Sequence, residues 1–205
     1  MNKVIIIIIS ILSVTTLFAQ GPPITTETPI MLGLEGNGIR TFGKFISKEN
    51  VTIYVQPIGI PYNITTKFQV GAIFPFKFIT PKNSKTTGGF ADMTIFAKYQ
   101  LYKKDGKAKT FRILVLVKQT FPTGKTSSSP AIGSGLSQTY VGLVLGKLNT
   151  KVGVYSDFGY NITNKNAYDN FLYNFSVGVP WLPHKYPQKQ LNTFLEFNGN
   201  YVLDP

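Results

Sequence analysis

The residues that could carry chemistry are few in this chain of 205 residues. It has one histidine, His184, no cysteine, and nine Asp and Glu residues beside 21 Lys and Arg. A serine hydrolase needs its histidine next to the nucleophilic serine, whereas the serine run 127–129 falls in a loop that we expect at the other end of the molecule. One histidine without cysteine also gives no metal-ligand spacing. We therefore expect no enzyme, no cofactor and no metal site.

A set of charged residues shares another property, because each lies opposite a run of apolar side chains in a segment that alternates with period two. If the apolar face points outward from a closed sheet, these charges line the interior. There they can pair as a structural network, which we favour, or border a polar path. The candidate lumen-lining residues are Asp92, Lys98, Arg112, Lys118, Asp157 and Glu196.

The elements that position these charges have the period of β-strands. The clearest is 111–121, in which Ile113, Val115 and Val117 alternate with residues of the opposite face. Asp105–Gly106 predicts a hairpin turn over 103–107, and 75–91 and 122–137 are expected to be longer loops. Nine strands are predicted: a weak one within 30–46, and others over 51–58, 64–74, 92–101, 109–121, 138–148, 151–161, 171–182 and 190–202.

Strand length and loop length favour a membrane barrel over a soluble sheet. Several strands reach about ten residues, the length that a tilted membrane strand needs, and short connections alternate with long ones. Tyr and Phe also gather near strand ends, as in aromatic girdles. The expected fold is all-β, an antiparallel up-and-down transmembrane β-barrel. A secreted soluble β-barrel or sandwich, which alternates too, is the alternative.

The N-terminus has the pattern of a secretory signal peptide. Lys3 is followed by an apolar run over 4–12 that is too short to span a bilayer as a helix, and then by the small residue Ala19. We expect residues 1–19 to be the signal peptide and residues 20–205 to form one barrel domain in the outer membrane of a Gram-negative bacterium. A retained membrane anchor is the alternative.

The net charge of +12 raises the question of partners. The lysines are scattered and the chain is expected to be exported, so we expect outer-membrane lipid as the partner and no nucleic acid.

The strand count predicts that the barrel domain is incomplete at the C-terminus. Bacterial single-chain barrels have an even number of strands, and an open edge would leave backbone groups unpaired in hydrocarbon. We expect at least one further strand after the nine, for a total of ten or twelve.

Several motifs follow one another along the chain in a recognisable order. They are 21–29 (Gly-Pro-Pro-x-x-Thr-x-x-Pro), 59–65 leading to 70–76, 89–99 (Gly-x-x-Asp, then Lys98-Tyr99) and 118–124 (Lys-x-x-x-Pro-Thr-Gly). Their order resembles a known family of proposed outer-membrane β-barrel transporters, the phenol-degradation MetA-pathway-like proteins. Glu27 and Thr28 replace that family's paired acids, which argues against a preserved N-terminal acidic site, and Ala91 replaces a glycine.

The resemblance implies passage of small, often aromatic or hydrophobic compounds across the outer membrane. We therefore expect a conduit or binding barrel with such a compound as its ligand. The alternative is a structural or surface-interaction barrel whose lumen is plugged.

Overall fold

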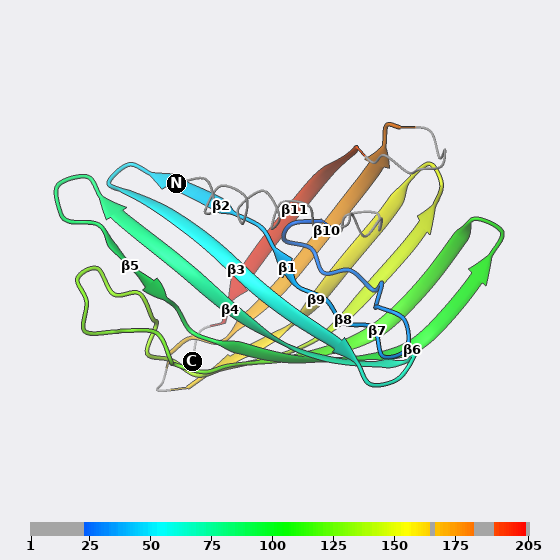
Figure 1. Ribbon diagram of the computed structural model, residues 1–205, viewed down its shortest axis with the longest axis horizontal. Coiled ribbons are helices and arrows are strands. Elements are labelled where there is room, and N and C mark those ends of the chain that lie inside the picture. Colours follow the sequence, from blue (N-terminus) through cyan, green and yellow to red (C-terminus); the bar gives the residue numbers. More distant parts are fainter. Residues whose placement is uncertain (1–22, 165–166, 183–190, 204–205) are drawn as a thin grey trace, which may run out of the picture.

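A computed structural model of the chain describes residues 23–164, 167–182 and 191–203, so the predicted signal peptide and His184 lie outside the described residues. The described residues form one antiparallel sheet, curled into a half-barrel (Figure 1). The all-β prediction is confirmed. The strands are β1 (Arg40–Thr41), β2 (Lys44–Lys48), β3 (Val51–Asn63), β4 (Phe68–Pro81), β5 (Thr87–Phe90), β6 (Thr94–Gly106), β7 (Lys109–Thr120), β8 (Gln138–Asn149), β9 (Gly153–Thr163), β10 (Asn170–Pro180) and β11 (Asn192–Val202).

The eleven strands occupy nine positions across the sheet. The order is β1-β3-β4-β6-β7-β8-β9-β10-β11, with β2 beside β1 on the edge of β3 and β5 on β4 beyond the point where β6 ends. Nine is therefore also the number of strand positions that the alternation predicts. In the described part of the chain no helix has the length and hydropathy needed to cross a membrane.

Burial alternates along the central strands with the predicted period. In β8 and β9 every second residue is buried, and the residues between them are more exposed. Leu114 and Leu116 of β7 are fully buried, whereas Val117 is exposed on the other face. Since successive side chains of a strand point to opposite faces, the buried set lines the concave side and the apolar set of Val117 covers the convex side.

The core lies on this concave side. Leu114, Leu116 and Val144 are inaccessible to solvent, and they form one cluster with Tyr140 and with Met31 from the N-terminal segment. Met31 precedes the first strand, so the sheet completes its core with a segment that is not part of the sheet.

The weak strand predicted within 30–46 is wrong in extent. In this part of the chain, β1 and β2 pair with β3, and before them Asn37 alone forms a bridge, with Tyr62. The residues up to Met31 follow the concave face instead. Backbone groups in this segment find side-chain partners: Asn63 donates to the carbonyl oxygen of Leu32 at 2.6 Å. A strand is not needed to satisfy them.

The turns of two hairpins lie farther along the chain than predicted. β6 continues through Asp105 to Gly106, which pairs with Lys109, and the turn is Lys107–Ala108, with Ala108 at a φ of 54°. The ladder extends because the Asp105 carboxylate accepts a hydrogen bond from the Thr110 hydroxyl and binds the Lys103 ammonium. Similarly, β3 continues to residue 63, so its turn with β4 moves from 59–63 to 64–67.

The expected loop over 75–91 is largely strand, because β4 continues to Pro81 and β5 returns along it. The β3–β4 ladder continues through the prolines of both strands. Pro57 faces Pro75 across the β3–β4 ladder. Proline lacks the backbone N–H, and each of these two prolines stands where the strand on its other side is interrupted. Pro57 faces the gap between β1 and β2, and Pro75 faces the gap between β6 and β5. Proline is tolerated where no ladder hydrogen bond is required.

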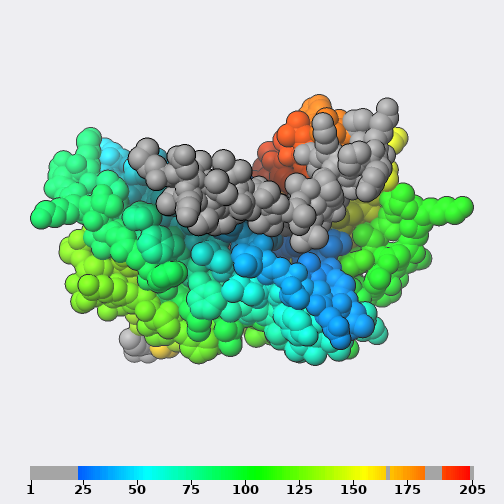
Figure 2. Space-filling view, in the orientation of Figure 1, coloured from blue at the N-terminus to red at the C-terminus, as the bar shows by residue number. Residues whose placement is uncertain are grey.

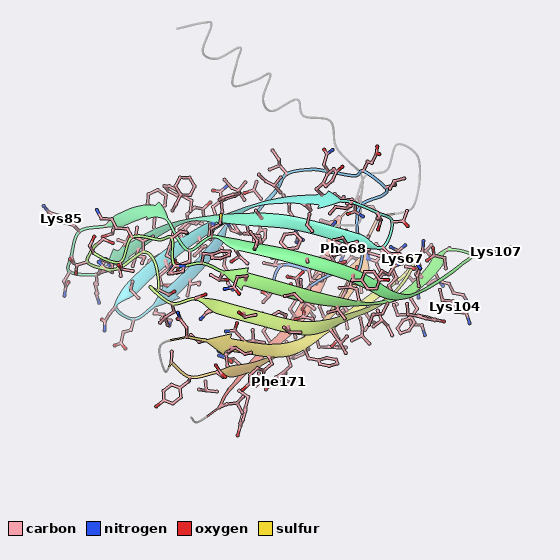
Figure 3. The ribbon with its side chains drawn as sticks, turned by 90° about the horizontal axis from the view of Figure 1, so that it is seen from below. Lys67, Phe68, Lys85, Lys104, Lys107 and Phe171 are labelled. Carbon is pink, nitrogen blue, oxygen red and sulfur yellow. The ribbon has the colours of Figure 1, made fainter. Side chains whose placement is uncertain are left out.

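The connections gather at two ends of the half-barrel. Lys67 and Lys107, in the short β3–β4 and β6–β7 connections, lie at one end together with Lys104 near the end of β6, and Lys85, between β4 and β5, lies at the other (Figure 3). We call the first the short-turn end. The second, the long-loop end, carries the β7–β8 connection over 121–137.

Candidate functional site

The N-terminal segment 23–39 lies across the concave face of the half-barrel, where it is drawn in blue (Figures 1 and 2). Pro23, Thr26 and Pro29 are buried although they belong to no strand. The segment has two prolines, Pro23 and Pro29, and no alternating pattern between them, so it lacks two backbone donors and a strand period with which to join the sheet. It is therefore seated against the sheet by its side chains and by its remaining N–H groups.

Glu27 is the centre of this contact. One oxygen of its carboxylate lies 2.8 Å from the Nζ of Lys98 on β6, and the other lies 2.6 Å from the Nζ of Lys118 on β7. The Lys98 side chain is 9% exposed and the Glu27 side chain 22%. Each ammonium also faces an aromatic ring, Lys98 that of Phe96 and Lys118 that of Tyr140. The three charges therefore form a largely buried triad.

Burial alone would raise the pKa of Glu27, because a low-dielectric surrounding disfavours the charged form. The two ammonium groups of Lys118 and Lys98 outweigh it through charge and hydrogen bonds, and the net result is a pKa well below the ordinary 4.5. Glu27 is therefore an anion at neutral pH, and the triad carries a net charge of +1.

Two strand carboxylates bind the backbone of the same segment. The Glu196 carboxylate on β11 accepts hydrogen bonds from the backbone N–H groups of Ile24, Thr25 and Thr26, at 2.7, 2.9 and 2.9 Å. Asp157 on β9 accepts one from the N–H of Glu27 at 2.7 Å. Hydrogen bonds to a charged acceptor are stronger than neutral ones, so four consecutive N–H groups are fixed by two carboxylates.

A close approach of backbone to ring seats the middle of the segment. A Cβ at Gly146 of β8 would lie 2.5 Å from Cγ of Pro29, well inside the usual contact distance between carbon atoms of about 3.5–4.0 Å. Glycine at this position is what lets the ring of Pro29 rest on the strand.

The segment borders two cavities in the half-barrel. One of about 540 Å³ opens near the β6–β7 and β8–β9 hairpins and is bordered by Thr28 and Ile30, with Arg112 and Tyr155 in its wall. The other, of about 450 Å³, lies toward the long-loop end. We call it the amide cavity, because its lining carries many side-chain amides: Gln138, Asn161, Asn174, Asn198 and Asn200, with Thr25, Glu27, Thr120, Lys118, Tyr140, Asp157, Leu172 and Gly199. The segment lies between the two spaces.

Four of the six candidate lumen-lining residues meet at the N-terminal segment. Lys98, Lys118, Asp157 and Glu196 all bind it. Arg112 is separate: it lines the cavity near the hairpins and lies 3.7 Å from Asp105.

Asp92, the sixth candidate, lies just before β6, and it lines neither of the two cavities. One oxygen of its carboxylate accepts the backbone N–H of Gly124 at 2.9 Å, and the other accepts the N–H and the hydroxyl of Ser134 at 2.6 and 2.7 Å. Burial alone would raise the pKa of Asp92, but these hydrogen bonds lower it by more than burial raises it, so the net shift of its pKa is downward. Asp92 thus ties together both ends of the β7–β8 loop.

Sequence reasoning did not find the role of Glu27. The replacement of the family's paired acids suggested that an N-terminal acidic site was lost, whereas the structure shows that one carboxylate binds both lysines. A signal was present: two lysines on the inward face need an acid, and Glu27 is the only acid between Gln20 and Leu34.

Among the described residues, no group of three or more His, Asp or Glu side chains could hold a metal ion.

The fold and these contacts define a class of protein, a curled antiparallel barrel sheet whose concave side is occupied by the chain's own N-terminal segment. A family described as "Putative MetA-pathway of phenol degradation" matches residues 44–197, well over half of the chain. The chain belongs to this family, as the order of motifs predicts. A comparison with curated proteins gave no match. The matched region contains Lys98, Lys118, Asp157 and Glu196, but it begins after Glu27.

Proposed function

We propose that the protein is an outer-membrane barrel that binds small compounds and lets them pass, with the segment 23–39 as an internal gate. The observation that carries the proposal is the first part of this segment, residues 23–31, which lies between two cavities and is fixed by charged side chains rather than by strand pairing. A segment that belonged to the sheet would need the ladder to break before it could move. Residues 23–31 can move once a few charge-assisted hydrogen bonds and ion pairs are broken and replaced by others.

The convex face supports a membrane location. Its side chains on β10 and β11 are large and apolar, and Leu195 and Phe197 are each 60% exposed. Soluble monomers rarely expose continuous apolar surface of this extent. Outer-membrane lipid is the partner that fits such a face, and export through the predicted signal peptide of residues 1–19 would bring the chain there.

The cavity near the hairpins supports small, partly apolar compounds as cargo. Ile30, Leu148, Tyr155 and Leu182 contribute apolar wall, and Arg112 contributes a charge. A volume of about 540 Å³ lies within the range of ligand sites, roughly 300–1,000 Å³. The family description names phenol degradation, and a small aromatic compound suits a wall of this composition.

A second candidate function is a structural or surface barrel with a permanently plugged lumen. The buried triad of Glu27, Lys98 and Lys118 favours it, because breaking a buried ion pair is costly. The two functions predict different behaviour of the same segment, so one experiment separates them.

Liposome swelling tests the proposal. The full chain is reconstituted beside a variant in which residues 23–31 are replaced by a Gly/Ser stretch of equal length, and neutral solutes of increasing size are compared. We expect slow swelling with the full chain and faster swelling with the variant. No swelling with either inserted protein would favour the plugged barrel, and equal swelling with both would refute the gate.

A further inference from the structure

We propose that Lys98 and Lys118 form an anion-binding site for small aromatic carboxylates, and that the carboxylate of Glu27 occupies this site when no ligand is bound. The inference rests on the proposed function, since it names the class of compound that the barrel takes. Glu27 is then a ligand supplied by the chain itself, and a compound with the same group competes with it.

The geometry of the site is that of a carboxylate receptor. The two ammonium groups contact different oxygens of one carboxylate, at 2.8 and 2.6 Å. The Lys98 side chain is more than nine-tenths buried, and besides Glu27 its ammonium donates only a long hydrogen bond of 3.5 Å to the carbonyl oxygen of Thr28, so little solvent can replace Glu27 when it leaves. Without Glu27, the described site has two positive charges within reach of one small anion.

An entry path leads to this site from the long-loop end. Glu27 and Lys118 both line the amide cavity, whereas Lys98 lies behind them. The Lys118 side chain is 29% exposed against 9% for Lys98. A carboxylate that enters the cavity therefore meets Lys118 first and reaches Lys98 by taking the place of Glu27.

The surroundings favour a flat apolar body on that carboxylate. Lys118 lies 5.4 Å from the centre of the Tyr140 ring, and Lys98 lies 5.8 Å from that of Phe96. Leu172 adds an apolar wall beside Tyr140 in the same cavity. A ring that follows the carboxylate into the site can contact these side chains, and the amides around the cavity can bind its polar substituents.

Asp157 is the negative charge that opposes such a ligand, because it lines the same cavity. Its two oxygens already accept hydrogen bonds from the N–H of Glu27 and from the side-chain amide of Asn174, at 2.7 and 2.8 Å. Two lysines against one aspartate leave the site with a net charge of +1 after Glu27 is displaced. The balance therefore favours a monocarboxylate, and a neutral analogue gains nothing from it.

Binding of benzoate to the purified full chain in detergent tests the inference, with benzamide as the neutral probe of the same shape. We expect E27Q to bind benzoate at least about tenfold more tightly than the unaltered chain, because the competing carboxylate is removed; tenfold corresponds to about 1.4 kcal/mol. Benzamide affinity should not change. Adding K118M to E27Q should remove the gain, whereas adding K147M should keep it, because Lys147 is exposed on the convex face of β8.

Three results would overturn the inference: benzoate affinity that is independent of residue 27, an equal gain for benzamide, or a gain that survives K118M. If E27Q does not fold, E27D keeps the charge on a shorter side chain and should show a smaller gain. The measurement needs no membrane passage. If the protein lets solutes pass but does not bind benzoate, the anion site is refuted and the conduit stands. If it binds benzoate but gives no swelling, the conduit is refuted and the anion site stands.

Discussion

Substitution of Gly146 by alanine should release the N-terminal segment without disturbing the sheet. The added Cβ would lie 2.5 Å from Cγ and 2.9 Å from Cδ of Pro29, so either the ring or the strand has to move. The strand is fixed by β7 and β9 on its two sides, whereas the ring belongs to a segment outside the ladder. Most of the displacement should therefore fall on the segment.

The size of the effect follows from the overlap. One extra methyl in a well-packed site costs about 1–3 kcal/mol, and each 1.4 kcal/mol changes an equilibrium constant about tenfold. The undocked fraction of the segment should rise by about one order of magnitude, and up to about two at the upper limit. Gly59→Ala is the matched control, because the nearest atoms to its Cβ would lie at 3.7 and 4.0 Å.

A single introduced cysteine reports this equilibrium, since the chain has none of its own. Thr26 is 3% exposed when the segment is docked, so maleimide labelling of Thr26→Cys at neutral pH measures undocking. We expect labelling about tenfold faster after Gly146→Ala and unchanged after Gly59→Ala, with the same β-sheet circular dichroism in all variants. Equal labelling rates in the two backgrounds would show that Pro29 does not depend on Gly146.

Three further predictions concern acid, lipid and loop. The pKa of Glu27 is lowered by docking, so its stabilisation is complete above the ordinary 4.5 and is lost as the pH falls below it; swelling with a neutral solute should rise on acidification below that value, and less so in E27Q. Arg at Val115, on the convex face, should destabilise the inserted barrel by roughly 2–4 kcal/mol if it lies near the membrane midplane, and Arg at Thr120 by much less; equal unfolding midpoints would refute the face assignment. D92N weakens three hydrogen bonds to the β7–β8 loop and should speed tryptic cleavage after Lys125, whereas S127A, at an exposed position of the same loop, should not.

The alternation of side chains made the sheet predictable, because burial on one face is a local property of each strand. In β8 and β9 every second residue is buried, as period two requires. Strand ends were less predictable, because they depend on neighbours. Asp105 extends the β6–β7 ladder through contacts with Thr110 and Lys103, and Pro57 and Pro75 stand where adjacent strands are interrupted. Both effects depend on a residue or a gap in a neighbouring strand, which the alternation within one strand does not show.

The strand residues of the site could be predicted from the sequence, but the N-terminal segment that they bind could not. Lys98, Lys118, Asp157 and Glu196 were singled out because each lies opposite a run of apolar side chains, and each of these positions is a feature of one strand. The partner that unites them is separated from them by 70 residues or more along the chain: Lys98 binds Glu27 across 71 residues and Glu196 binds Thr26 across 170. The alternation within a strand extends over about ten residues and therefore cannot predict contacts over such separations.

Glu27 also shows why a missing motif residue does not by itself remove a site. A pattern of two adjacent acids suggests one acid for each lysine, so Thr28 reads as a loss. A carboxylate, however, has two oxygens, and here each of them binds one ammonium group. The neighbouring position is then free to contribute something else: the Thr28 hydroxyl accepts the N–H of Ile30 at 3.2 Å and helps to turn the chain around Pro29. If the second acid were required, E27Q and the unaltered chain would differ little in benzoate binding, since the lysine pair would already be open to ligand. A large difference would show that one carboxylate is enough to occupy it.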